Sequence, residues 1–146
     1  RGGSKRIPNK NLKLICDQPM IYWPLMELSK RIHSKNIIVS TDSENIISCV
    51  KKIGINVCFK RPKSLSNDHI GTIPVATHAL KWFEDKFHSV NNVVMIYPTA
   101  LMINLDDIDT ALTFLNNDPK CDSIMFDSFL VPIFTLLLIA KSIPFT

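Results

Sequence analysis

Glycine is scarce in this chain of 146 residues, which contains only four. The pair Gly2-Gly3 fits neither the G-x-x-x-x-G-K-[ST] sequence of a P-loop nor the G-x-G-x-x-G sequence of a dinucleotide-binding fold. Cysteine is equally rare, and the four cysteines form no C-x-x-C pair. A zinc site and a disulfide framework are therefore not expected, and the thiols are predicted to be reduced and mostly buried.

Long apolar runs are also missing. The longest covers residues 129–140, about 12 residues, whereas a membrane-spanning helix needs about 20. No secretory signal is visible, so we expect a cytoplasmic protein without a membrane partner. Hydrophobic residues make up 46% of the chain and charged residues 21%, which is typical of a packed domain and excludes disorder as the main state. The length predicts one domain, or a piece of one.

Basic charge is concentrated at the start of the sequence. The chain carries 17 Lys and Arg against 13 Asp and Glu, a net charge of +4. Five of the basic residues and none of the acidic ones fall within residues 1–13, so the rest of the chain has a net charge of −1. Two of the four glycines lie in the same segment. The opening segment is therefore the first candidate for binding an anion.

The rest of the sequence alternates between β-branched runs and amphipathic segments. Strands are predicted at residues 36–41, 55–60, 92–97 and 123–126, and helices at residues 44–53, 72–87 and 104–115. Thr41 and Glu44 fit a capping box, and Gly54 fits a left-handed helix end. Alternation of this kind predicts an α/β fold with a mostly parallel sheet and helices on both faces.

Ligands of such sheets bind at the carboxyl ends of the strands. The candidate binding loops are therefore residues 1–11, 40–43, 61–72 and 98–104. Residues 1–11 (RGGSKRIPNKN) have the components of a phosphate-binding loop: two glycines, a hydroxyl and several cations. A solvated basic terminus explains the same composition. Nucleic-acid binding is a further alternative, although no aromatic residues are interleaved with the basic ones.

The order of several motifs resembles a known family. The run RGGSKRIPNKN is similar to the signature of the cytidylyltransferases that activate nonulosonic acids as CMP-sugars, which include the acylneuraminate cytidylyltransferases. Further similar segments follow in the family's order at residues 18–21 (QPMI), 38–46 (IVSTDSENI) and 59–68 (FKRPKSLSND). Residues 68–82 and 96–100 (IYPTA) look most like the pseudaminic acid cytidylyltransferases.

This resemblance implies a Rossmann-like nucleotidyltransferase fold and an enzyme that forms a CMP-sugar and pyrophosphate from CTP and a sugar acid. Arg1, Lys5 and Lys10 are the implied catalytic residues. The implied CTP-binding residues are Gly2, Gly3, Ser4, Asn11, Arg61 and Thr72. Tyr97 is the implied contact to the sugar. The family also implies Mg²⁺, with ligands outside this chain, and a homodimer; nucleic acid is not an expected partner.

Individual residues also allow simpler interpretations. Arg61 can form an ion pair with Asp68 across its loop. Thr72 can serve as a helix N-cap, and Tyr97 can be a packing residue at the end of a strand. Three acids at positions 106, 107 and 109 resemble a metal cluster, but acids are favoured at the start of any helix, so we expect no metal ligand there.

The resemblance further implies that residues 1–146 form the N-terminal, CTP-binding part of a single domain. In this interpretation the fold is truncated, since the first strand and the C-terminal half are missing, and residues 127–146 are a divergent apolar tail. The chain alone is then expected to be inactive or nearly so. Two alternatives stay open: a CMP-N-acetylneuraminate (sialic acid) synthetase, and a non-catalytic fragment that binds CTP.

Overall fold

The computed structural model describes residues 7–55, 57–125 and 137–141. The helices are α1 (Tyr22–Ser29), α2 (Glu44–Lys52), α3 (Thr72–Lys86) and α4 (Leu105–Asn117), and the strands are β1 (Leu14–Ile15), β2 (Gln18–Pro19), β3 (Ile37–Val39), β4 (Asn92–Ile96) and β5 (Leu137–Lys141). Short 3-10 turns lie at Lys10–Leu12, Ser34–Asn36 and Lys63–Leu65. The predicted α/β class is confirmed. None of the helices in these ranges has the length and apolar character that crossing a bilayer requires.

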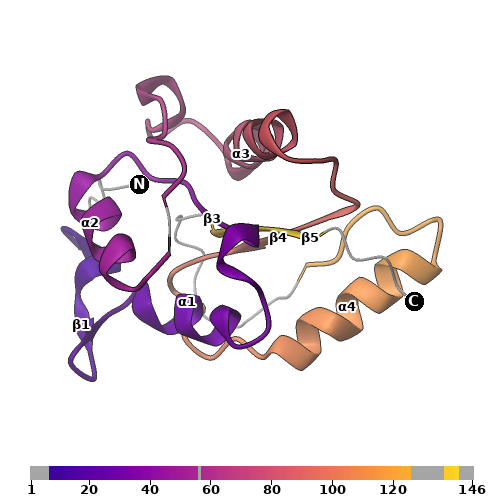
Figure 1. Cartoon of the computed structure of the whole chain (residues 1–146), viewed down its shortest axis with the longest axis horizontal. Helices are drawn as coiled ribbons and strands as arrows, with labels where there is room; N and C mark the ends of the chain where they lie inside the picture. Colours follow the sequence, from indigo (N-terminus) through magenta and orange to yellow (C-terminus); the bar gives the residue numbers. More distant parts are fainter. Residues whose placement is uncertain (1–6, 56, 126–136, 142–146) are drawn as a thin grey trace.

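Helices cover both faces of the sheet formed by β3, β4 and β5. Figure 1 shows α3 on one side of it, and α1 and α4 on the other. The buried side chains of β3 follow the alternation of a strand. Ile37 and Val39 belong to the core shared with α1, α2 and α4, whereas Ile38 packs with α3. The prediction of helices on both faces is therefore confirmed for this part of the chain.

The order and direction of the strands differ from the prediction. The sheet has the order β3-β5-β4, and both neighbouring pairs are antiparallel. Val39 and Ile96 are both register partners of Leu137, so β3 and β4 run in the same direction with β5 between them. The predicted parallel ladder is wrong for these strands because β5, from the segment expected to be an apolar tail, separates them.

Two predicted strands are also absent from the described residues. Between residues 55 and 60 the backbone forms a single parallel bridge, from Lys60 to Thr41. Residues 123–125 are not in a strand, and residue 126 lies outside the described residues. Both segments are apolar enough for a strand, but a strand is defined by its partner, and no ladder forms beside the described residues of either segment.

The start of α2 is capped differently from the prediction. Ser43 is the N-cap, and its hydroxyl accepts a hydrogen bond from the Ile46 amide at 3.5 Å. Thr41, the predicted cap, accepts instead from the Ser43 amide at 3.2 Å. Glu44 does not close a capping box, since it pairs with Lys60. The predicted end of the helix is confirmed, because Gly54 has a φ of 90° and its amide donates to the Lys51 carbonyl.

Gly54→Ala is expected to lower the free energy of unfolding by about 1 kcal/mol, because a side chain rarely tolerates the left-handed backbone there. An added Cβ would have no atom within 4 Å, so the cost is conformational and not steric. Gly71→Ala is the matched control, since Gly71 is extended at φ −70° and an added Cβ is equally uncrowded. Urea denaturation should place this control within about 0.5 kcal/mol of wild type. Equal losses in both variants would contradict the explanation.

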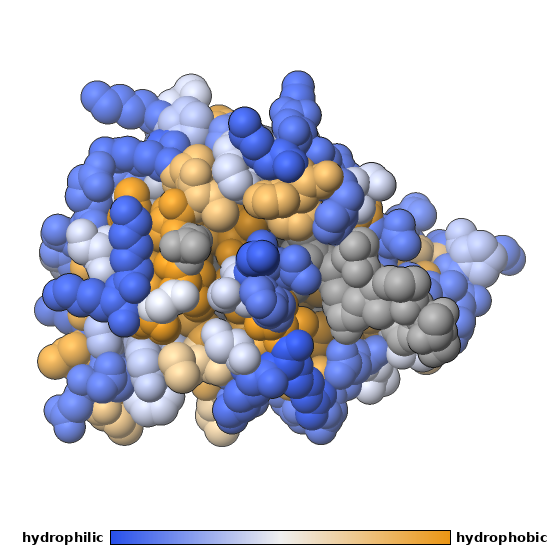
Figure 2. All heavy atoms as spheres, viewed as in Figure 1, coloured by the Kyte–Doolittle hydropathy of each residue, from blue (hydrophilic) through white to orange (hydrophobic). Residues whose placement is uncertain are grey.

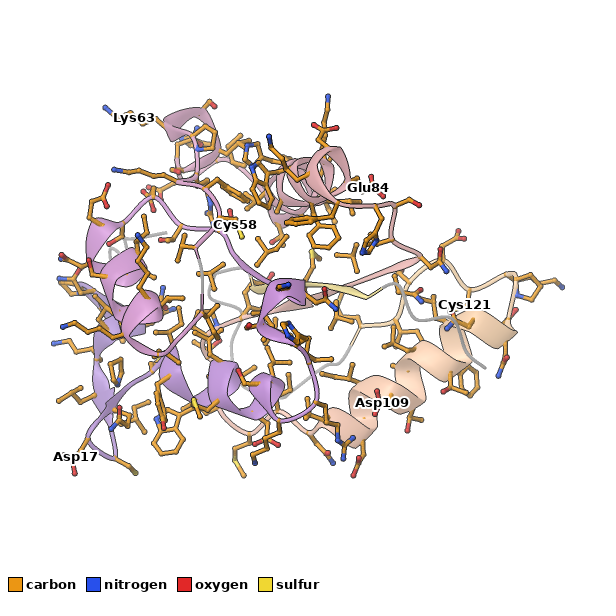
Figure 3. The ribbon with its side chains drawn as sticks, viewed as in Figure 1. Asp17, Cys58, Lys63, Glu84, Asp109 and Cys121 are labelled. Atoms are coloured by element: carbon orange, nitrogen blue, oxygen red, sulfur yellow. The ribbon has the colours of Figure 1, made fainter. Side chains whose placement is uncertain are left out.

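The cysteines are free thiols, as predicted, but the expectation that most are buried is wrong. Cys16 is exposed, and the other three are partly exposed. Cys16 and Asp17 have positive φ between β1 and β2. Asp17 lies at one corner of the molecule in Figure 3. Cys58 and Cys121 lie far apart in the same view. Partial burial raises the pKa of Cys49 and Cys58, which favours their unreactive thiol form.

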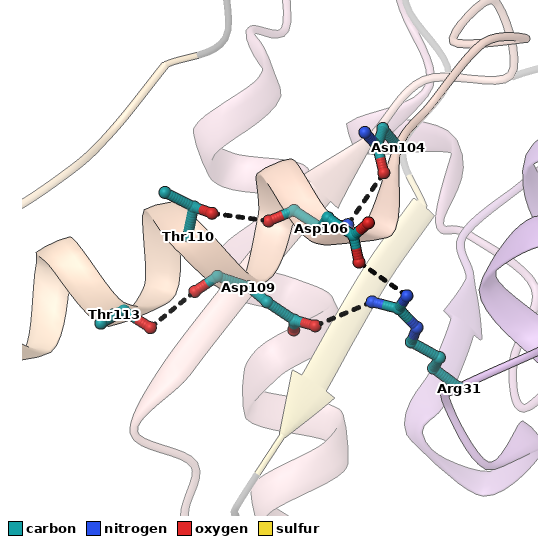
Figure 4. A network of polar contacts seen from close by, with 6 residues as sticks. All are labelled: Arg31, Asn104, Asp106, Asp109, Thr110 and Thr113. Carbon is teal, nitrogen blue, oxygen red and sulfur yellow. Dashed lines mark hydrogen bonds and ion pairs between the residues drawn. The ribbon is translucent and has the colours of Figure 1, made fainter.

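The acids at the start of α4 bind an arginine. Asn104 caps the helix by accepting from the Asp106 amide at 2.9 Å. Arg31, which follows α1, contacts Asp106 at 2.6 Å through Nη2 and Asp109 at 3.1 Å through Nη1 (Figure 4). No group of three or more His, Cys, Asp or Glu side chains within the described ranges is placed to hold a metal ion. Asp106 and Asp107 lie in the first turn of α4, as the helix-start interpretation expects, whereas Asp109 lies one turn further on.

Candidate active site

The carboxyl ends of β3 and β4 lie at the same edge of the sheet. Val39 and Ile96, their last residues, flank Leu137 of β5, so about 10 Å, two strand spacings, separates them. Ser40 and Thr41 follow β3, and Tyr97 follows β4. The bridge from Thr41 to Lys60 brings Arg61 to the same edge. Residues of the predicted loops 40–43 and 61–72 therefore meet here, beside the residue that precedes the predicted loop 98–104.

Arg61 is buried and held by the residues that follow β3. Arg61 is only 7% exposed, and Ser40 is fully buried. Arg61 Nε donates to Ser40 Oγ at 3.1 Å, Nη2 donates to the Ser40 carbonyl, and the Arg61 amide donates to the Thr41 carbonyl at 2.8 Å. In contrast, Lys63 points away from the protein from its 3-10 turn (Figure 3). Arg61 is thus a fixed cation inside the fold.

Ser40 is a residue that the sequence analysis missed as a site residue. It lies in the candidate loop at residues 40–43, but the sequence predicted no role for it. A signal was available in the sequence, since Ser40 is the first hydroxyl after a buried β-branched run and lies where ligand loops begin. Through its hydroxyl and its carbonyl, Ser40 contacts the guanidinium of Arg61, a residue that is distant in the sequence. Spacing alone does not reveal such a partner.

Lys10 and Asn11 are buried polar residues in the 3-10 turn Lys10–Leu12. Lys10 is 5% exposed and Asn11 is 4% exposed. The turn begins at Asn9, whose φ of 52° is left-handed, and it lies against α2. The Asn11 carbonyl accepts from the Ile21 amide at 3.0 Å, which ties the turn to the residue before α1. Both side chains were predicted to contact the nucleotide.

The Lys10 ammonium is electrostatically unusual. Its Nζ is buried and has no hydrogen-bond partner among the described residues. Burial lowers the pKa of Lys10 below its ordinary value, because removal from water penalises the charged form. A buried cation without a partner is costly, and an anion bound beside it would offset that cost. The described structure therefore contains a feature suited to a phosphate group.

Thr72 and Tyr97 are joined directly. Thr72 is the first residue of α3, and Tyr97 directly follows β4. Their hydroxyl oxygens are 3.0 Å apart, and both side chains are partly buried. The N-cap of α3 is Gly71, so the interpretation of Thr72 as the cap is wrong. The hydroxyl pair connects two residues that the sequence assigned to different substrates.

The surface around these residues is mixed in character. Figure 2 shows apolar residues in the space between α2 and α3, bordered by polar side chains. Phe59, His78 and Trp82 contribute ring contacts beside α3, and the rings of Phe59 and His78 are 4.9 Å apart. His78 and Trp82 are thus partly buried packing residues of α3. The predicted residues Arg1, Gly2, Gly3, Ser4 and Lys5 lie outside the described residues.

Comparison with known proteins decides the family. The sequence profile described as Cytidylyltransferase matches residues 1–125. The chain belongs to the cytidylyltransferase family. Its match covers the 3-10 turn with Lys10, the buried Arg61 and the Thr72–Tyr97 pair.

The chain is similar to several proteins whose names state the sugar acid on which they act. It is 31% identical over 121 residues to a pseudaminic acid cytidylyltransferase of Campylobacter jejuni, covering 82% of this chain and 52% of that protein. A CMP-N,N'-diacetyllegionaminic acid synthase of the same species is 39% identical over 87 residues, which cover 60% of this chain and 37% of the synthase. An N-acylneuraminate cytidylyltransferase of Escherichia coli is 28% identical over 100 residues, covering 68% and 23%. The chain thus spans about half or less of the length of these relatives.

Proposed function

We propose that the protein is a cytidylyltransferase that makes a CMP-nonulosonic acid and pyrophosphate from CTP and the sugar acid. CMP-pseudaminic acid is the proposed product, because the match to a pseudaminic acid cytidylyltransferase extends over more of the chain than the match to the legionaminic acid synthase. The observation that carries the proposal is the buried Lys10 ammonium, which lacks a described partner and lies in the family's match.

The proposed reaction transfers a cytidylyl group. The anomeric hydroxyl oxygen of the sugar acid attacks the α-phosphorus of CTP, the bond from that phosphorus to the bridging oxygen breaks, and pyrophosphate leaves. Such a transfer depends on positioning and on neutralising the negative charge that develops on the phosphates. Arg1, Lys5 and Lys10 would supply the positive charge that neutralises the phosphates. The backbone of Gly2 and Gly3 would approach the phosphates closely.

The remaining residues would bind the rest of the two substrates. Ser4 would add a hydroxyl donor to the phosphates, and Asn11 would contact the triphosphate and the nucleotide sugar. Arg61 and Thr72 would contact the nucleoside end of CTP. The rigid attachment of Arg61 to Ser40 supports this role, since a fixed guanidinium presents its donors in one direction. Tyr97 would contact the sugar acid at the neighbouring strand end.

Magnesium is part of the prediction but has no identified ligands. The described residues do not supply a metal cluster, and Asp106 and Asp109 are engaged by Arg31. We therefore assign no step to the ion. The predicted homodimer and cytoplasmic location belong to the same proposal.

Thermal unfolding with and without CTP tests the nucleotide site. CTP should raise the melting temperature through its binding to the folded state, and Lys5→Ala should remove most of this shift. Lys13→Ala is the matched control because Lys13 is exposed in the same basic segment, and it should keep the shift. Equal loss in both variants, together with nucleic-acid binding that falls steeply with salt, would favour a nucleic-acid binder instead.

Pyrophosphate release from CTP, pseudaminic acid and Mg²⁺ then tests the reaction, with sialic acid as the competing substrate.

A further inference from the structure

The residue before Lys10 has a backbone conformation that most side chains avoid. Asn9 has φ 52° and ψ 33°, in the left-handed region, where the Cβ atom crowds the backbone. The Lys10 amide donates to the Ile7 carbonyl at 3.2 Å, so residues 7–10 form a hydrogen-bonded turn. Proline in the second position and a left-handed residue in the third are typical of a type II turn, and Pro8 and Asn9 occupy these positions. The local sequence therefore favours the observed reversal of the chain.

This reversal leads directly into the 3-10 turn that contains Lys10. The Asn9 carbonyl accepts from the Leu12 amide at 2.8 Å, and the Lys10 carbonyl accepts from the Lys13 amide at 3.0 Å. The peptide group between Asn9 and Lys10 belongs to both turns, so the backbone angles of Asn9 set the direction of each. Asn9 is exposed, whereas Lys10, the next residue, is only 5% exposed. The backbone of Asn9 thus directs Lys10 into the protein.

The burial of Lys10 needs such a constraint. A lysine side chain is flexible and its ammonium is strongly hydrated, so an unconstrained lysine extends toward water. Lys10 Nζ is instead buried, and it has no hydrogen-bond partner among the described residues that would hold it there. The backbone and the packing around it must therefore impose this position. The free-energy cost of the buried charge would be recovered when a phosphate binds beside it.

We propose that left-handed Asn9 is a positioning residue, which holds the Lys10 ammonium inside the nucleotide site before CTP binds. This inference rests on the proposed function, which assigns Lys10 to the phosphates of CTP. A lysine that is already in place binds more tightly, because the cost of ordering it is met in the free protein. When Asn9 leaves the left-handed region, the Lys10 side chain moves to solvent. Only the fraction of molecules that retain the turn then binds CTP with full affinity.

Three substitutions at Asn9 test the role of its backbone, with CTP affinity measured by calorimetry. Asn9→Gly keeps the left-handed conformation accessible, so the affinity should stay within about threefold of wild type. Asn9→Val should weaken binding about tenfold, because a β-branched residue strongly disfavours this conformation. Asn9→Ala should weaken binding less than Asn9→Val, and it keeps the test available if Asn9→Val does not fold. Equal losses in Asn9→Gly and Asn9→Val would mean that the side chain matters, and would overturn the proposal.

Asp17 supplies a matched control for the backbone change. It is also left-handed, with φ 61°, but it lies between β1 and β2 at a corner of the molecule (Figure 3). Asp17→Val should lower the melting temperature, as Asn9→Val does, yet keep CTP affinity within about twofold of wild type. If Asp17→Val loses as much CTP affinity as Asn9→Val, the effect is general destabilisation and the proposal is wrong.

Chemical labelling of lysines reports the position of Lys10, which a change in stability alone would not move. An amine-reactive succinimidyl ester should modify the exposed Lys13 in every protein and leave Lys10 unmodified in wild type, Asn9→Gly and Asp17→Val. Mass spectrometry of proteolytic peptides should find Lys10 modified in Asn9→Val. If Lys10 stays protected there, Asn9 does not hold it, although the nucleotide site stands. If CTP does not bind the wild-type protein, the proposed function and the positioning role are both overturned.

Discussion

Replacing Lys10 with methionine is expected to weaken CTP binding about 10- to 100-fold, the loss of one charge-assisted hydrogen bond to a phosphate. The same substitution should leave the ligand-free protein at least as stable as wild type. The reason is that Lys10 Nζ is buried without a described partner, and a methionine of similar length removes the buried charge while keeping the apolar stem. Titration calorimetry and urea denaturation measure the two effects on the same sample.

The lowered pKa of Lys10 fixes how the stability of the free protein and its affinity for CTP change with pH. An unfolded lysine titrates near 10.5, and the buried Lys10 loses its proton at lower pH. Between these two pKa values the unfolded chain binds more protons, so the stability of the free protein rises with pH through this window. CTP favours the protonated lysine, so its binding should take up protons and weaken as pH rises. Lys10→Met should lack both effects.

Lys13→Met is the matched control for Lys10→Met, since Lys13 is three residues along and exposed. It should change CTP affinity by less than about threefold, because an exposed cation is screened by water and salt. A destabilised Lys10→Met protein would show that the ammonium has a partner in the free protein. Unchanged CTP affinity in that variant would show that the buried lysine is outside the nucleotide site.

Arg61→Met is expected to lower the free energy of unfolding by about 2–4 kcal/mol. The guanidinium satisfies the hydroxyl and the carbonyl of Ser40, a residue with no exposed surface, and each buried group left without its donor costs about 1–3 kcal/mol. Part of this cost is offset because the methionine carries no charge to bury. Urea denaturation followed by tryptophan fluorescence measures the change.

Two further variants separate the contributions around Arg61. Ser40→Ala removes one of the two acceptors and should cost about 1 kcal/mol. Lys60→Met is the matched control on the neighbouring residue, whose exposed pair with Glu44 should contribute less than about 0.5 kcal/mol. A loss in Arg61→Met no larger than that in Lys60→Met would contradict the anchoring role of Arg61.

The sequence predicted helices better than strands for a physical reason. Apolar spacing along α2, α3 and α4 reports the buried face of each helix directly, since the hydrogen bonds of a helix are local. Residues 55–60 and 123–126 have the composition of strands, but pairing depends on a partner elsewhere in the chain. The strand β5 comes from a segment whose partners, β3 and β4, are both distant in sequence. No local pattern contains that information.

The candidate site was only partly predictable, because local patterns locate loops but do not reveal which distant side chains meet. Loop positions after predicted strands were enough to predict that residues 40–43 and 61–72 lie at one edge of the sheet. The resemblance to a family added the individual residues Lys10, Asn11 and Arg61, and the structure shows each of them buried. The Ser40–Arg61 and Thr72–Tyr97 contacts were not predicted, because each joins side chains that only the tertiary fold brings together.

The position of β5 has a consequence for how the protein is synthesised. β5 lies at the centre of the sheet, yet it follows all other described elements in the chain. Its pairing with β3 places Ile37 opposite Ile139. The long loop between these two residues must close first, which is entropically costly and slow. During translation the helices can form as they leave the ribosome, whereas the sheet cannot form until its central strand, β5, has been synthesised. Nascent chains stalled before residue 137 should therefore expose the edges of β3 and β4 to chaperones, and chains stalled well after it should not.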